Sequence, residues 1–208
     1  QENVFYYITL LNENYAMPGL TPGTEEQIIK GMYLCKPGAE GDKRVQLLGS
    51  GTILRESLEA QKLLATDWGV QADVWSCPSF NELTRDGQDA ERWNLLHPLE
   101  APRVPFVAQQ LGQRSGPVVA STDYMKNYAE QIRAFIPAGR TYKVLGTDGF
   151  GRSDFRSKLR EHFEVNRHYI AVAALKALAE EGQLPLAKVA EAIQKYGIQT
   201  EKNNPLYA

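Results

Sequence analysis

Short apolar segments alternate with helical patterns along most of this chain, and this alternation limits the fold more than any other feature. Strand-sized apolar runs occur at residues 44–48, 72–76, 117–120 and 142–145. The segments between them are typical of helices, at residues 52–68, 80–96 and 121–135. Strands that alternate with helices predict an open, mainly parallel sheet covered on both faces. The expected fold class is therefore three-layer α/β/α.

Helix signals continue beyond the last predicted strand, so we expect a helical C-terminal tail. Its helices are predicted over residues 153–163, 166–181 and 185–196. In the last of them, Leu186, Val189, Ala190 and Ile193 have the spacing of one apolar helix face. Earlier in the chain, Ser79 is followed by glutamate three residues later, as in a capping box.

Charge and cysteine content exclude several classes of protein. Among 208 residues, 23 Lys and Arg balance 25 Asp and Glu, whereas nucleic-acid binders usually cluster basic residues. No apolar run approaches the ~18 residues of a membrane span. Cys35 and Cys77 fit no metal or redox spacing. We expect a cytoplasmic protein that binds neither nucleic acid nor membrane.

The first 23 residues are expected to stand apart from the rest. A strand is predicted over residues 4–10, with no partner strand in its neighbourhood, and residues 12–23 have the Asn, Pro and Gly content of a connector. The chain has no initiator Met and opens almost directly in this strand. We therefore expect residues 1–23 to be the last strand of a preceding domain plus a linker, and residues 24–208 to be one α/β domain.

The turn at Gly49 and Gly51 has the context of a dinucleotide site, because it joins a predicted strand to a predicted helix. Asp73 follows at about the 20-residue distance of the acidic residue in such sites. However, Leu54 fills the third glycine position, and Asp73 lies inside its strand instead of at its end. A tight structural turn is the favoured interpretation, with a stand-alone nucleotide-binding module as the alternative.

A second glycine-rich turn follows the predicted strand at 142–145. Gly146, Gly149 and Gly151 have the reversed spacing of the dinucleotide fingerprint, and no lysine stands where a phosphate-binding loop needs one. We interpret all three as structural glycines, with Ser153 or Asp154 capping the next helix.

The titratable residues suggest no reaction by themselves. The charges at residues 85–92 are spaced as on a solvated helix face with local ion pairs. His97, His162 and His168 are scattered and lie in no recognised nucleophile setting. We therefore predict no catalytic residue, no cofactor-binding residue and no metal ligand in this chain.

Several strings, read in order, resemble the C-terminal domain of the thiamine-diphosphate enzymes related to transketolase. They are VQLLGSGTIL, DVWSCPSFNEL, VVASTDYMKNYAEQI and GTDGFGRSDFRSKLREHFEV. Within that superfamily, four strings are more similar to the branch of homodimeric, single-chain bacterial pyruvate dehydrogenases. These are LLNENYAMP, LTRDGQDAERWNLLHPLE, STDYMKNYAEQ and LGTDGFGRSD. Another transketolase-like enzyme is the alternative.

The resemblance implies that the chemistry lies outside this chain. In these enzymes thiamine diphosphate and Mg²⁺ are held by the two preceding domains, together with the catalytic residues. The C-terminal domain, residues 24–208 here, is then a scaffold and part of the homodimer surface. In this branch it is also associated with docking the dihydrolipoyl acetyltransferase core.

The resemblance also singles out Asn12, Glu13, Asn14 and Tyr15. They occupy the strand end at which transketolases carry an arginine-containing segment that faces the substrate phosphate. Pyruvate has no phosphate, and an unpaired buried guanidinium would cost several kcal/mol, so loss of the arginine is chemically reasonable. We expect these four residues to lie beside the active-site channel, with a polar interdomain turn as the alternative.

Overall fold

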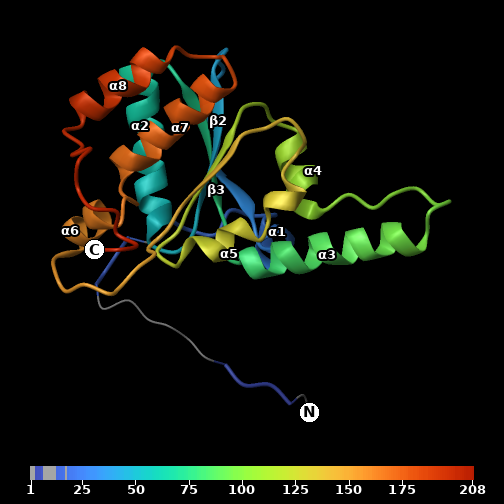
Figure 1. The fold of residues 1–208 in the computed structure, drawn as a ribbon. Coiled ribbons are helices and arrows are strands. Elements are labelled where there is room, and N and C mark those ends of the chain that lie inside the picture. Colours follow the sequence, from blue (N-terminus) through green and yellow to red (C-terminus); the bar gives the residue numbers. More distant parts are fainter. Residues whose placement is uncertain (1–2, 7–12, 17) are drawn as a thin grey trace.

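The computed structural model of the chain describes residues 3–6, 13–16 and 18–208 and contains one five-stranded sheet between two layers of helices (Figure 1). The strands lie in the order β1-β3-β2-β4-β5. Their bounds are β1 Tyr33–Lys36, β2 Arg44–Gly49, β3 Gln71–Ser76, β4 Val118–Ser121 and β5 Tyr142–Leu145. Neighbouring strands from β3 to β5 are parallel, and β1 pairs antiparallel with β3 at the edge. The predicted fold class is confirmed.

Helices cover both faces of the sheet, and each face has its own apolar core. One core lies under α2 (Ile53–Trp68), α7 (Arg167–Glu180) and α8 (Leu186–Lys195). The other lies under α3 (Phe80–Leu96), α4 (Phe106–Gly112), α5 (Lys126–Glu130) and the 3₁₀ helix η1 (Arg133–Phe135). Two short helices, α1 (Glu25–Ile29) and α6 (Arg156–His162), complete the chain. The predicted helical tail is present as α6, α7 and α8, which follow β5.

The two cores follow from the alternation of side chains along the strands. Leu47 packs in the core under α2 and α7, whereas Leu48 packs in the core under α3 and α4. Successive side chains of a strand point to opposite faces, so apolar residues at consecutive positions require cover on both. Both leucines are fully buried.

The ends of α2 and α7 agree with the predicted bounds 52–68 and 166–181 to within one residue. Gly69 ends α2 in the left-handed conformation at φ 64°, and the Asn166 side chain accepts hydrogen bonds from the first turn of α7. Ser79 Oγ accepts a hydrogen bond from the Glu82 amide at 3.1 Å. The Glu82 carboxylate pairs with Arg85 at 2.9 Å, so only one half of the capping box is formed.

Two predicted helix starts are wrong. Ser121 belongs to β4, where its hydroxyl lies 3.0 Å from that of Ser57, and an irregular turn precedes α5. The segment 121–135 therefore forms only α5 and η1. Helix α6 begins at Arg156, and neither Ser153 nor Asp154 caps it, because Asp154 accepts a hydrogen bond from the adjacent Phe155 amide instead.

The apolar face predicted for α8 is rotated. Val189 and Ala192 are buried and Ile193 is partly buried, whereas Leu186 is 61% exposed and Ala190 is exposed. The stripe that meets α7 therefore uses positions i, i+3 and i+4 from Val189.

Residues 3–6 lie away from the domain (Figure 1). Of the strand predicted over residues 4–10, residues 4–6 have no regular secondary structure, and residues 7–10 lie outside the described part of the chain. The division of the chain at residue 23 stays a prediction.

Helix α3 projects well beyond the sheet, and the chain returns from its end in an extended segment (Figure 1). We call residues 89–105 the arm. Its return segment is tied to the helix by Asn94, whose side chain exchanges two hydrogen bonds with the backbone of Arg103, at 2.7 and 3.0 Å. The Arg103 guanidinium stacks 3.5 Å from the Trp93 ring centroid. The arm is therefore held in shape by its own contacts, while Leu95, Leu96, Leu99 and Val104 remain exposed.

Candidate functional site

The predicted glycine turns meet at the carboxyl end of the parallel strands. The turn after β2 leads to Thr52, the turn after β4 carries Asp123, and the turn after β5 contains Gly149 and Gly151. These residues line one hollow of about 310 Å³, together with α6. Since β2 has β3 on one side and β4 on the other, the hollow lies where ligands bind in many open α/β sheets.

A carboxylate already occupies the start of α2. Thr52 Oγ1 donates a hydrogen bond to Asp123 Oδ2 at 3.0 Å. A Cβ atom added to Gly51 would lie 3.0 Å from Asp123 Oδ1. In dinucleotide-binding folds the cofactor phosphate takes this position, because the helix N-terminus attracts negative charge. Asp123 would repel a phosphate here, which argues against a nucleotide site at this turn.

Gly49 is required by close packing between strand and helix. A Cβ atom at this position would lie 2.7 Å from Leu54 Cα and 2.9 Å from Ser57 Oγ. Although Leu54 fills the third glycine position, α2 comes close to the end of β2, because Gly49 has no side chain. The glycine thus serves helix packing and leaves no space for a ligand between strand and helix.

Asp73 is buried inside β3 and is fully occupied by protein partners. Its carboxylate accepts hydrogen bonds from the Gly38 amide and the Gln46 side chain, both at 2.9 Å. Arg44 and Arg114 lie 2.9 and 3.0 Å from it. Burial opposes its ionisation, but these hydrogen bonds and the two arginines outweigh burial and hold the pKa of Asp73 below its ordinary value. Asp73 is therefore a core ion-pair residue.

The glycines after β5 differ in their surroundings. A Cβ atom on Gly146 would lie 2.7 Å from the backbone nitrogen of Lys126. Gly149 has φ 105°, and a side chain there would overlap the carbonyl oxygen of Pro205 in the C-terminal tail. Gly151 has open space around it. Backbone contacts therefore give a reason for glycine at the first two positions, and a structural role for Gly151 stays a prediction.

Two of the four candidate channel residues, Glu13 and Tyr15, contact α6 or α2. Arg156 Nε of α6 is 2.7 Å from Glu13 Oε2, and the Tyr15 hydroxyl also donates to the Glu13 carboxylate. Arg160 Nη2 donates to the Tyr15 hydroxyl at 3.2 Å. Asn14 is exposed, and Asn12 lies outside the described residues. The segment 13–16 is therefore fixed at the same end of the sheet as the glycine turns.

Helix α2 completes this attachment. Arg55 Nη1 donates to the carbonyl oxygen of Ala16 at 3.2 Å, and its guanidinium lies 4.6 Å from the Tyr15 ring centroid. Sequence reasoning did not select Arg55, Arg156 or Arg160. The spacing of Arg156 and Arg160, four residues apart on one helix face, was the available signal.

A buried carboxylate on α2 connects α6 to α7. Glu56 is 3% exposed and accepts hydrogen bonds from Arg160 Nη1 at 3.2 Å and from the Arg167 amide and guanidinium at 2.9 to 3.1 Å. Burial raises the pKa of a carboxyl group, but Arg167, with Arg160, lowers that of Glu56 below its ordinary value. Glu56 is therefore ionised at neutral pH and anchors both helices.

The histidines are not brought together. His97 stacks on Trp93 with ring centroids 3.5 Å apart, and His168 stacks on Tyr196 at 4.8 Å. His162 is in edge contact with Phe163. Within the described ranges, no group of three or more metal-ligating side chains could hold a metal ion. None of the helices formed by these residues combines the length and apolar character needed to cross a bilayer.

The family of the chain follows from a match to a family model. Residues 31–166 match the model of the transketolase-like TK C-terminal domain, and the chain belongs to this family. The fold agrees: transketolase from Pichia stipitis superimposes with a TM-score of 0.51 over 81% of this chain and 21% of that chain, at 17% identity.

Curated relatives narrow the comparison to one kind of enzyme. The chain is 61% identical over 99% of its length to the pyruvate dehydrogenase E1 component of Pseudomonas aeruginosa. It is 58% identical over its whole length to the protein of that name from Escherichia coli K12. In both cases the chain spans 23% of the relative's length.

Proposed function

We propose that this chain is the C-terminal domain of a thiamine-diphosphate-dependent pyruvate dehydrogenase, the component that decarboxylates pyruvate and acetylates a lipoyl group. The observation that carries the proposal is the 61% identity, over nearly the whole chain, to a relative named pyruvate dehydrogenase E1 component. Because the chain spans about a quarter of that relative, the activity is proposed for the full-length protein.

The chain itself acts as scaffold, and the cofactor belongs to other domains of the full-length protein. Thiamine diphosphate, held with Mg²⁺, supplies the electron sink for loss of CO₂. The described residues at the start of α2 do not fit that cofactor: Asp123 lies where a diphosphate would meet α2, and Thr52 already donates a hydrogen bond to it. These observations support a role outside the catalytic centre.

Residues 12–15 are the part of the chain that we place beside the active-site channel. The support is the attachment of Glu13 and Tyr15 to α6, which gives this segment a defined position at one end of the sheet. The contact of Arg55 on α2 with the Tyr15 ring adds to this support. In the full-length enzyme, Asn12→Ala and Glu13→Ala should change pyruvate kinetics or lipoyl acetylation.

The proposed partners are a second copy of the enzyme and the dihydrolipoyl acetyltransferase core. The relatives are named as one component of an enzyme, which supports a multienzyme complex. The arm supports a subunit contact, because its apolar side chains are exposed although its backbone is braced. Both cysteines are free, which fits a reducing cytoplasm as the proposed compartment.

The proposal is tested by substrate preference of the full-length protein. With thiamine diphosphate and Mg²⁺, we expect decarboxylation of pyruvate and much slower decarboxylation of 2-oxoglutarate. A preference for 2-oxoglutarate or for sugar phosphates would contradict the proposed activity. Titration calorimetry of the full-length protein against the peripheral-subunit-binding domain of the acetyltransferase tests the partner, and absence of binding would contradict that part.

A further inference from the structure

One connected set of side chains links the interior of the domain to the segment before it. It runs from Glu56 through Arg160 and Tyr15 to Glu13, and Arg156 and Arg55 support its outer end. We call these six residues the latch. We infer that Arg55, Arg156 and Arg160 are positioning residues, which hold segment 13–16 in place beside the channel. This inference rests on the proposed function.

Arg160 is the central member of the latch. One end of its guanidinium is fixed by the buried Glu56 carboxylate, and the other end donates to the Tyr15 hydroxyl. The guanidinium is planar and rigid, so fixing one nitrogen also fixes the direction of the other. The position of the Tyr15 hydroxyl is thereby set from the interior of the domain.

Helix α6 depends on polar contacts for its own position. None of its residues is buried, and its one apolar side chain, that of Leu159, is only partly covered. Its C-terminal end is held by Lys202, whose Nζ donates to the carbonyl oxygens of Glu161 and His162 at 3.1 and 2.8 Å. An element with so few buried apolar contacts opens easily when its polar contacts are removed.

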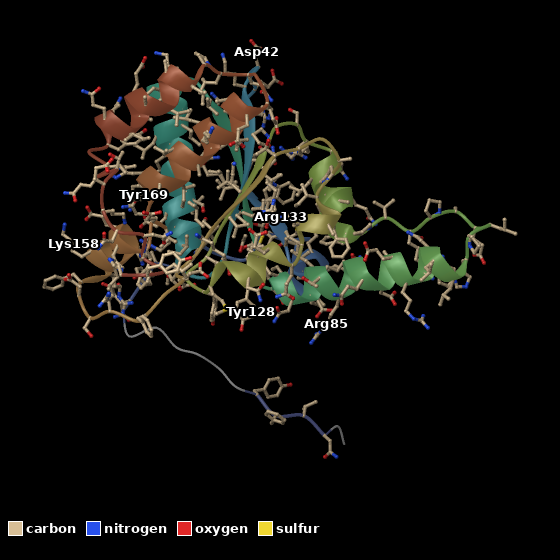
Figure 2. The ribbon with its side chains drawn as sticks, viewed as in Figure 1. Asp42, Arg85, Tyr128, Arg133, Lys158 and Tyr169 are labelled. Atoms are coloured by element: carbon tan, nitrogen blue, oxygen red, sulfur yellow. The ribbon has the colours of Figure 1, made fainter. Side chains whose placement is uncertain are left out.

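A neighbouring cation on α6, Lys158, takes no part in the latch and offers a control. Lys158, on the same helix, pairs with Glu161 at 3.0 Å and projects outward from the domain (Figure 2). Its side chain is 64% exposed. Lys158→Ala therefore removes a charge from α6 without touching segment 13–16, and it is a matched control.

The test uses the full-length enzyme and two substitutions. Tyr15→Phe removes only the hydroxyl and keeps the ring under Arg55, and Arg160→Gln removes the central cation. The amides of α6 are hydrogen-bonded, so their exchange with solvent reports how often this helix opens. One hydrogen bond of about 1 kcal/mol corresponds to about fivefold faster amide hydrogen exchange in α6. We expect about a fivefold increase in the exchange rate in Tyr15→Phe, a larger increase in Arg160→Gln, and no increase in Lys158→Ala.

The kinetic constants for pyruvate show whether the latch positions segment 13–16 for the reaction or only attaches it to the domain. Displacement of a substrate-side segment by about 1 Å can cost up to about 100-fold in rate. We expect kcat/KM for pyruvate to fall about tenfold, mainly through KM, in both latch variants, with Lys158→Ala unchanged.

Unchanged exchange in Tyr15→Phe and Arg160→Gln would overturn the latch. Faster exchange with kinetic constants equal to those of the unaltered enzyme would overturn the positioning role. If the unaltered enzyme does not turn over pyruvate, the proposed function fails instead, and the exchange measurement alone decides the latch.

Discussion

At the scale of single residues, the buried carboxylate of Glu56 on α2 holds arginines of both α6 and α7. It receives three hydrogen bonds from Arg167 and one from Arg160. Removing one partner of a buried ion pair typically costs about 3 kcal/mol or more, because the other charges lose their compensation. We predict that Glu56→Gln lowers the free energy of unfolding of the chain by about 3 kcal/mol in urea titrations.

The same residue predicts a pH dependence. The pKa of Glu56 is lower in the folded chain than its ordinary value of 4.5. The stabilisation is therefore complete above pH 4.5 and is lost as pH falls through the lower folded-state value. Between pH 5 and pH 3, as approximate limits, the unaltered chain should lose more stability than Glu56→Gln. Equal losses in both would contradict this assignment.

Gly149 and Gly151 form a matched pair of substitutions. Gly149→Ala places a side chain at φ 105° and against Pro205, and we predict a loss of about 2 kcal/mol in unfolding free energy. Gly151→Ala meets no neighbouring atom and should change stability by less than about 0.5 kcal/mol. Similar effects of the two changes would show that the C-terminal tail does not require glycine at position 149.

At the scale of elements, the start of α3 offers a direct test of the half-formed capping box. Ser79→Ala removes the hydroxyl that accepts from Glu82 and should cost about 1 kcal/mol. Glu82→Ala removes a carboxylate that pairs with exposed Arg85 and cannot complete a capping box, and it should cost less than about 0.5 kcal/mol. Comparable losses in thermal unfolding would mean that the reciprocal half of the box forms after all.

The four parallel strands and most helices could be predicted because their signals are local. The apolar runs, Gly69 and the Asn166 cap all act within a few residues of the sequence. Edge strand β1 was missed, since its residues Tyr33–Lys36 are only partly buried and its pairing with β3 is irregular. An amphipathic pattern cannot mark a strand that buries neither face fully.

The latch could not be predicted from local patterns. Tyr15 and Arg160 are 145 residues apart, and Glu56 and Arg167 are 111 apart. Nothing in the sequence around Glu56 distinguishes it from a solvated helix glutamate, because its burial depends on α6 and α7 folding over α2. The glycine turns were visible in the sequence, but the Asp123 carboxylate at the start of α2 depends on the pairing of β2 with β4.

At the scale of the whole molecule, the arm predicts a surface for association. Leu99 is 99% exposed and Leu95 is 78% exposed, so their replacement should leave the fold intact. We predict that Leu95→Ser with Leu99→Ser weakens self-association of the full-length protein in sedimentation equilibrium at unchanged thermal stability. Arg85→Ala, on the exposed face of α3 nearer the sheet (Figure 2), serves as the control and should leave association unchanged. Unchanged association of the double variant would exclude the arm from the subunit contact.

We propose that this domain supports a reaction whose cofactor is bound by other domains of the full-length protein. Titration calorimetry of thiamine diphosphate with Mg²⁺, performed in parallel on the 208-residue chain and on the full-length protein, tests it most directly. We expect saturable binding to the full-length protein and no binding to the 208-residue chain. Saturable binding to the chain alone, or none to the full-length protein, would contradict it.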